Sequence, residues 1–107
     1  MKLIFAPEAR EDMENIFRYY VSRNENYAVE LYNQVIEEAE LSLNFPKMGQ
    51  KELLLNEYPE DYYSLVVWHS YKIVYFLEND AVNVVAVFDC RQNPNKLKPI
   101  IHAKNQK

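Results

Sequence analysis

The chain has 107 residues, of which 49% are hydrophobic and 14% aromatic, so it is long enough for one domain with a hydrophobic core and too short for two. A single Gly argues against the glycine-rich loops that bind phosphates or dinucleotides, and a single Cys excludes an internal disulfide and fits a reducing cytoplasm. The formal net charge is −4. No segment approaches the ~20 apolar residues of a membrane span or resembles a signal peptide, so we expect a soluble protein of cytoplasmic localisation.

The first half of the chain predicts a short strand followed by two helices. Residues 2–6 (KLIFA) have β-forming character, and the proline after them suits the first turn of a helix. Apolar residues then recur at helical spacing over 9–21 and again over 28–43, with either Asn24 or Asn26 as the cap of the second helix. Because the join between the helices is short, we expect an antiparallel hairpin with one apolar face against a sheet.

The second half predicts the sheet. Its β-type runs span 52–58, 62–69, 71–78 and 81–89, with Asn79 and Asp80 at the tip of the last turn. The short connections favour antiparallel neighbours, and the run at 71–78 is largely apolar on both sides, as expected for a central strand. The predicted fold class is therefore α+β, with an N-terminal strand and a two-helix hairpin packed on a mainly antiparallel sheet.

The end of the chain differs from the rest in charge. Residues 1–89 contain all sixteen acidic residues and seven basic ones, whereas residues 90–107 contain five basic residues and no acidic one. A basic segment on an acidic body favours an anionic partner, although a solvated, frayed terminus would explain the same charges. We expect one domain over residues 1–97 and a basic C-terminal tail over 98–107.

Metal ligation and nucleophilic catalysis have little support in the sequence. His69, His102, Asp89 and Cys90 are the plausible ligands, but they follow no spacing of a known metal site, so no metal is expected. Cys90 and His69 could meet at the ends of neighbouring strands. A lone Cys is, however, more often a small buried hydrophobe.

Three cations form a stronger candidate site. A hairpin turning at 79–80 places Lys72 opposite residues 87–88, so Arg91 should extend past Lys72 and close to His69. A guanidinium, an ammonium and an imidazole at one edge of the sheet would bind phosphate or carboxylate groups and move protons. Three unrelated surface cations are the alternative.

Most aromatic residues of the sheet are expected to pack in the core. Tyr62 and Tyr63 lie near a loop and are the ones we expect to be exposed. Exposed aromatic side chains on a sheet can stack bases, as they do in RNA-binding modules, or contact a protein partner.

Four motifs follow one another along the chain. They are an A-x-x-D-M-x-x-I run (Ala9, Asp12, Met13, Ile16), a P-x-x-G after the hairpin (Pro46, Gly49), a Tyr-Lys-Ile-Val-Tyr strand (71–75), and a last strand that ends in Arg91 and an Asn-Pro pair. In this order and spacing, residues 2–97 resemble the RelE/ParE superfamily of bacterial type II toxins. The resemblance implies a helical hairpin on a twisted antiparallel sheet. It also implies a toxin that a cognate antitoxin holds inactive in a hetero-oligomer.

The resemblance leaves two mechanisms open. RelE-like members cleave mRNA in the ribosome with a cluster of basic, acidic, His or Tyr side chains across the sheet face. ParE-like members lack that cluster, and they bind and poison DNA gyrase. If the chain is RelE-like, the resemblance implies that Arg91, Lys72 and His69 are catalytic residues.

Only part of the RelE-like catalytic cluster has counterparts in this sequence. Lys72 and Arg91 stand where RelE-like nucleases have catalytic arginines. Tyr63 and Leu65 replace lysines, and Leu97 replaces a stacking tyrosine. The long helical hairpin also favours the ParE-like branch. Many ParE-like chains carry Arg near the start of the strand at 62–68, where this chain has Tyr.

We therefore predict a ParE-like toxin that inhibits DNA gyrase, is not an enzyme and uses no cofactor. Its expected partner-binding residues are Arg91, Tyr62, Tyr63, Lys96 and Lys98. The alternative is an endoribonuclease that cleaves mRNA on the ribosome, in which Arg91 and Lys72 would stabilise the charge that develops on phosphate and His69 or Tyr71 would move protons. A third possibility is an inactive family member that binds a partner.

Overall fold

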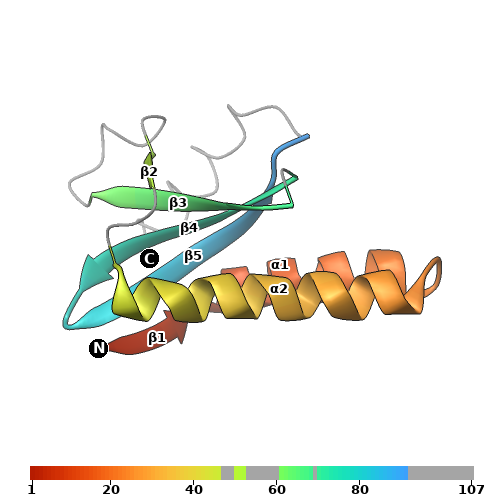
Figure 1. Cartoon of the computed structure of the whole chain (residues 1–107), viewed down its shortest axis with the longest axis horizontal. Coiled ribbons are helices and arrows are strands. Elements are labelled where there is room, and N and C mark those ends of the chain that lie inside the picture. Colours follow the sequence, from red (N-terminus) through yellow and green to blue (C-terminus); the bar gives the residue numbers. More distant parts are fainter. Residues whose placement is uncertain (47–49, 53–60, 69, 92–107) are drawn as a thin grey trace.

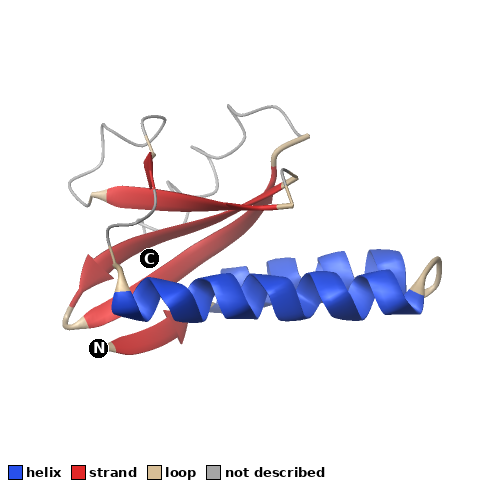
Figure 2. Cartoon of the chain, in the orientation of Figure 1, coloured by secondary structure: helices blue, strands red, loops and turns tan. Residues whose placement is uncertain are grey.

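The computed structural model of the chain describes residues 1–46, 50–52, 61–68 and 70–91. Within these residues the elements are β1 (Lys2–Phe5), α1 (Pro7–Val21), α2 (Glu25–Asn44), β2 (Gln50–Lys51), β3 (Tyr62–Val67), β4 (Tyr71–Glu78) and β5 (Ala81–Asp89). The helical hairpin lies along one face of the sheet, and its tip reaches beyond the sheet (Figures 1 and 2). This arrangement confirms the predicted α+β architecture.

The two helices begin and end where local chemistry requires it. Pro7 opens α1, where its missing N–H and fixed φ do no harm, and Ala9 and Met13 are buried toward the core. Asn24 caps α2, because its side chain accepts a hydrogen bond of 3.1 Å from the backbone N–H of Tyr27. No helix of the described residues is sufficiently long and apolar to cross a membrane.

The sheet order is β1-β5-β4-β3-β2. Among the described strands, only β1 and β5 pair in parallel, and the other neighbours are antiparallel, as predicted for most of the sheet. Asn79 and Asp80 form the turn between β4 and β5 with φ of 56° and 55°, values that short polar residues tolerate in a tight hairpin. The run predicted at 52–58 starts just after β2, and its residues 53–58 lie outside the described part of the chain.

Both faces of the sheet carry buried apolar side chains. On the helix-covered face, Ile73 and Tyr75 of β4 belong to the main core with residues of both helices. On the other face, Val74 of β4 belongs to a second cluster with four further buried side chains, Tyr62, Val85, Ala86 and Phe88. β4 is thus buried on both sides, which confirms its prediction as a central strand.

β5 is paired along its full length on one side and along half of it on the other. On the β4 side the pairing runs from Glu78↔Ala81 to Tyr71↔Asp89, with a bulge that leaves Val85 without a partner residue. On the other side β1 pairs only with residues 81–84, because the chain turns into α1 at Pro7. We call the uncovered edge of residues 85–89 the half-edge of β5; among the described elements, none is a strand that lies beside it.

The role of Asn24 can be tested against its neighbour Asn26. Replacing Asn24 by Ala should lower the free energy of unfolding by about 1 kcal/mol, because an N–H at the start of α2 loses its side-chain acceptor. Replacing Asn26 by Ala should have no destabilising effect, since Ala is the better helix former inside α2. Urea unfolding of both variants measures the difference, and equal destabilisation would contradict the assignment of the cap.

Candidate functional site

Arg91 is held at the end of β5 by Asp89. The Nε and Nη2 groups of Arg91 each donate to a different carboxylate oxygen of Asp89 at 3.0 Å, and the backbone N–H of Arg91 donates to the same carboxylate at 2.9 Å. This forked geometry fixes the guanidinium more firmly than a single contact would. Hydrogen bonding to Arg91 lowers the pKa of Asp89 below its ordinary value.

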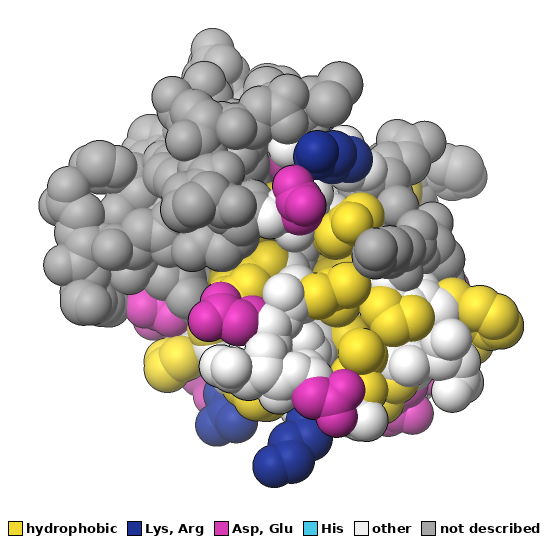
Figure 3. Space-filling view, turned by 90° about the vertical axis from the view of Figure 1, so that its left-hand side faces the viewer, with side chains coloured by type: hydrophobic (Ala, Val, Ile, Leu, Met, Phe, Trp, Pro, Cys, Tyr) yellow, Lys and Arg dark blue, Asp and Glu magenta, His cyan; other side chains and the backbone are white. Residues whose placement is uncertain are grey.

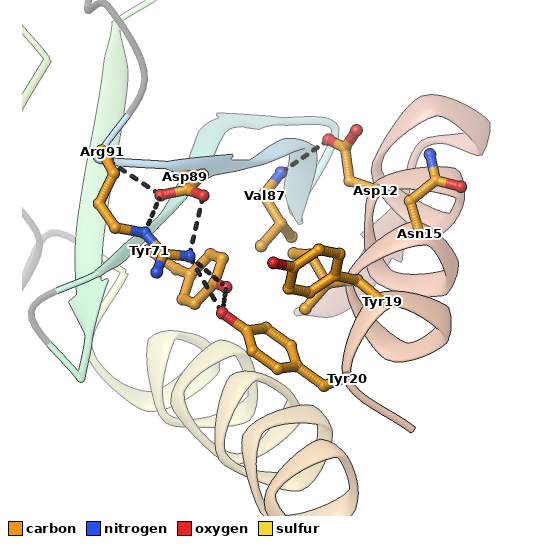
Figure 4. Close-up of a pocket in the computed structure, with 9 residues that line it drawn as sticks. Asp12, Asn15, Tyr19, Tyr20, Tyr71, Val87, Asp89 and Arg91 are labelled. Carbon is orange, nitrogen blue, oxygen red and sulfur yellow. Dashed lines mark hydrogen bonds and ion pairs between the residues drawn. The ribbon is translucent and has the colours of Figure 1, made fainter. Parts of the chain in front are cut away.

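Two tyrosines complete this arrangement (Figure 4). Nη2 of Arg91 also lies 3.1 Å from the hydroxyls of Tyr20 and Tyr71, and the Tyr71 hydroxyl donates to that of Tyr20 at 3.2 Å. Hydrogen bonds from Tyr71 and Arg91 lower the pKa of Tyr20, whereas burial raises the pKa of Tyr71. We call Asp89, Arg91, Tyr20 and Tyr71 the arginine cluster; it ties α1 to the ends of β4 and β5.

A pocket of about 490 Å³ opens between α1 and the half-edge of β5. Its lining comprises Asp12, Asn15, Ile16, Tyr19, Tyr20, Tyr71, Val87, Asp89 and Arg91. The Asp12 carboxylate accepts a hydrogen bond of 3.0 Å from the backbone N–H of Val87 (Figure 4). Backbone groups alternate in direction along an antiparallel ladder, so the carbonyl of Val87 and the N–H and carbonyl of Asp89 point to the same side. The pocket therefore presents strand backbone to a ligand.

Lys72 lies on the opposite face of the sheet from the arginine cluster. Its ammonium is 2.9 Å from a carboxylate oxygen of Glu52, whose side chain is only 5% exposed. Lys72 pairs with Phe88, which belongs to the cluster on the helix-free face, whereas Arg91 bonds to Tyr20 of α1 on the helix-covered face. The expectation of one basic site that contains both Lys72 and Arg91 is therefore wrong. His69 lies outside the described residues.

The exposure predicted for Tyr62 is also wrong. Its side chain is 2% exposed and packs edge-on against Phe76, with ring centroids 5.6 Å apart. Tyr63 points to the other face, where it is half-buried and stacks on Tyr75. Successive residues of a strand face opposite sides, and both faces of this sheet carry buried side chains. The expected partner-binding residues Lys96 and Lys98 lie outside the described residues.

Asp89 and Tyr20 were not predicted as partners of Arg91, and Tyr71 was predicted only as a possible proton carrier of a nuclease. The Asp-x-Arg spacing at the end of the last strand could have indicated that Asp89 pairs with Arg91, because residues at positions i and i+2 of a strand lie on the same face. The hairpin register also places Tyr71 opposite Asp89. Nothing in the sequence indicated Tyr20, which approaches only through the packing of α1. Within the described ranges, no three His, Cys, Asp or Glu side chains gather as a metal-binding group.

Comparisons with known proteins agree with this fold. A search of curated proteins finds no match. Among solved structures, the chain is similar to one described as the chromosomal ParDE TA system from P. aeruginosa, with a TM-score of 0.69 and 14% identity over 83% of this chain and 95% of that chain. At this identity the likeness concerns the fold alone, a two-helix hairpin on a five-stranded sheet.

The family is shown by sequence. Residues 3–94 match the family model described as the ParE toxin of the type II toxin-antitoxin system parDE. The chain belongs to this family, as the resemblance to the RelE/ParE superfamily implied. Arg91 falls within the matched residues.

The pair formed by Asp89 and Arg91 should make stability depend on pH. Because the pKa of Asp89 is lowered on folding, its contribution is present above the ordinary value of 3.8 and is lost as the pH falls through the lowered value. The Asp89→Asn variant should be less stable at pH 7 by about 1 kcal/mol or less, since Arg91 is largely exposed. The difference from the wild type should shrink as the pH falls below 3.8.

Urea unfolding at several pH values tests this expectation. Glu11→Gln is the matched control, because Glu11 is an exposed acid of α1 and the substitution changes the net charge equally. A stability difference that Glu11→Gln reproduces, or that does not change with pH, would contradict the role of the pair.

Proposed function

We propose that this chain is a toxin that acts by binding rather than by catalysis, with DNA gyrase as its target and a cognate antitoxin as its cytoplasmic inhibitor. Membership of the ParE family supports the toxin role and the pairing with an antitoxin. The gyrase target follows from the ParE-like branch of the superfamily, which lacks the catalytic cluster of the RelE-like nucleases.

One observation carries the choice of binding over RNA cleavage. Cleavage needs a cation free to stabilise the charge that develops on phosphate and a base beside the reacting hydroxyl. Lys72 and Arg91 stand on opposite faces of the sheet, and each is paired with a carboxylate, Glu52 and Asp89 respectively. A phosphate would have to compete with a carboxylate for either cation, and it could not contact both.

The half-edge of β5 supports the antitoxin as partner. An extended segment can add to an exposed sheet edge, where main-chain hydrogen bonds give affinity and side-chain pockets give specificity. The outward carbonyl of Val87 and both backbone groups of Asp89 offer such bonds beside the 490 Å³ pocket. We propose that an extended antitoxin segment lies here, between β5 and α1.

Gyrase supercoiling in the presence of the purified protein tests the target. Inhibition is expected at low molar excess, with no cleavage of ribosome-bound mRNA. Lys72→Met combined with Glu52→Gln, which removes both charges of this ion pair, should leave inhibition within about twofold of the wild type, because the pair lies on the opposite face of the sheet from the arginine cluster. Unimpaired supercoiling at high excess would refute gyrase as target. Cleavage of mRNA that Lys72→Met or Arg91→Ala abolishes would instead establish the nuclease.

Amide hydrogen exchange tests the position of the antitoxin. The backbone N–H of Asp89 points to the half-edge and should exchange more slowly when the antitoxin is added. The N–H of Phe88 is the control, because it points to β4, where Phe88 pairs with Lys72. Unchanged exchange at Asp89 in a formed complex would place the antitoxin elsewhere.

A further inference from the structure

Four aromatic side chains from three parts of the chain form a continuous row at one end of the molecule. Tyr19 and Tyr20 end α1, Tyr27 begins α2, and Trp68 follows β3. Centroid distances between successive rings are 4.8 Å for Tyr19–Tyr20, 4.8 Å for Tyr20–Tyr27 and 5.4 Å for Tyr27–Trp68. We call these four residues the aromatic row. The end of α1 and the start of α2, which carry the three tyrosines, form the hairpin tip that reaches beyond the sheet (Figure 1).

The two ends of the row are open to solvent. Tyr19 is 55% exposed and Trp68 is 38% exposed, while Tyr20 and Tyr27 between them are half-buried. Trp68 adopts φ of 52°, a left-handed conformation that is unfavourable for a bulky residue. Such conformations persist where the surrounding structure enforces them, and they concentrate at functional positions. The strained turn here holds an exposed Trp against Tyr27.

Two arginines accompany the row. The guanidinium carbon of Arg23 lies 4.0 Å from the centroid of the Tyr19 ring, and Arg91 bonds to the hydroxyl of Tyr20. Arg23 forms no salt bridge within the described ranges, in contrast to Arg18, which pairs with Glu14. The stacked guanidinium of Arg23 is therefore held in place while its charge stays available to a partner.

The composition of this surface indicates the kind of partner. Trp, Tyr and Arg are the residues that most often dominate the binding energy of protein–protein interfaces. A nucleic acid fits less well, because residues 1–89 contain sixteen acidic and seven basic residues and would repel a polyanion. A carboxylate on a protein surface would match Arg23, since guanidinium and carboxylate pair in a forked geometry.

We propose that the aromatic row with Arg23 is the surface that docks on the toxin's target, through an acidic patch of a protein. This inference rests on the proposed function in one respect: it assumes that the toxin acts by binding a protein. The row overlaps the proposed antitoxin site only in part, because Arg23, Tyr27 and Trp68 do not line the pocket at the half-edge. Tyr19 and Tyr20 belong to both surfaces.

Charge reversal at Arg23 tests the proposal. Arg23→Glu should weaken gyrase inhibition at least about tenfold, the size expected for an interface hot spot, and leave antitoxin binding within about twofold. Arg10→Glu is the control, since Arg10 of α1 is also an exposed arginine and the substitution changes the net charge equally. Retained antitoxin binding shows that each variant is folded.

Removal of the aromatic end gives a second, independent test. Trp68→Ala should also weaken inhibition, whereas Phe45→Ala should not, although Phe45 is 63% exposed. Phe45 follows α2 at the other end of the hairpin, on the side where hydrophobic side chains lie among acidic and basic ones (Figure 3). Inhibition unchanged in both Arg23→Glu and Trp68→Ala would overturn the proposal. So would an equal loss of antitoxin binding, or tight binding of single-stranded nucleic acid that depends on Trp68.

Failure of the proposed function can be told apart from failure of this inference. If the wild-type protein does not inhibit gyrase, the target assignment fails, and growth arrest on induction becomes the measurement. Arg23→Glu and Trp68→Ala should then relieve growth arrest while antitoxin binding persists. If both variants arrest growth as strongly as the wild type, the proposal that the aromatic row binds the target is overturned, whatever the target is.

Discussion

The early end of β1 determines how the rest of the site is built. Pro7 has no backbone N–H to donate to a ladder, and its φ suits the start of a helix, so the chain leaves the sheet after Phe5. β5 is nine residues long, and β1 covers it only over residues 81–84. The remainder of that edge faces α1, which supplies Asp12 to one N–H and leaves a pocket beside the rest.

The arginine cluster closes the far end of this pocket and links three elements. Asp89 fixes Arg91, Arg91 reaches Tyr20 of α1, and Tyr71 of β4 bonds to both. A guanidinium held in this way can position the hairpin and still present an exposed side to a partner. The same fixation makes Arg91 a poor centre for phosphate chemistry, because Asp89 already balances its charge. The cluster thus favours a role in recognition.

Much of the fold followed from the sequence because its signals are local. Helical periodicity, the proline at the start of α1 and the Asn-Asp turn each act over a few residues, and all were predicted correctly. The placement of Lys72 and Arg91 was a different matter. The predicted register, with Lys72 opposite residues 87–88, was right. Arg91, however, lies three residues beyond Phe88, and the alternation of side chains along a strand places it on the opposite face from Lys72. Counting this alternation along the sequence would have predicted that Lys72 and Arg91 lie on opposite faces.

Other parts of the site could not be predicted because they depend on packing between distant segments. Tyr20 and Tyr71 are separated by 51 positions and meet only when α1 lies at one angle on the sheet. Glu52 reaches Lys72 across 20 positions, from a segment that follows a two-residue strand. Tyr62 was expected to be exposed from its place near a loop, whereas it belongs to the buried cluster on the helix-free face of the sheet.

The hydrogen bond between Asp12 and Val87 also has a consequence for the chain when it is alone. An uncovered strand edge is a template for pairing with another copy, and natural proteins protect such edges with inward-pointing charges. The Asp12 carboxylate already accepts the hydrogen bond of the Val87 N–H, which a strand from a second copy would otherwise use for pairing. Two copies brought edge to edge would also place their Asp12 carboxylates near each other. A charge in this position disfavours pairing of two copies at the edge where we propose that the antitoxin segment binds.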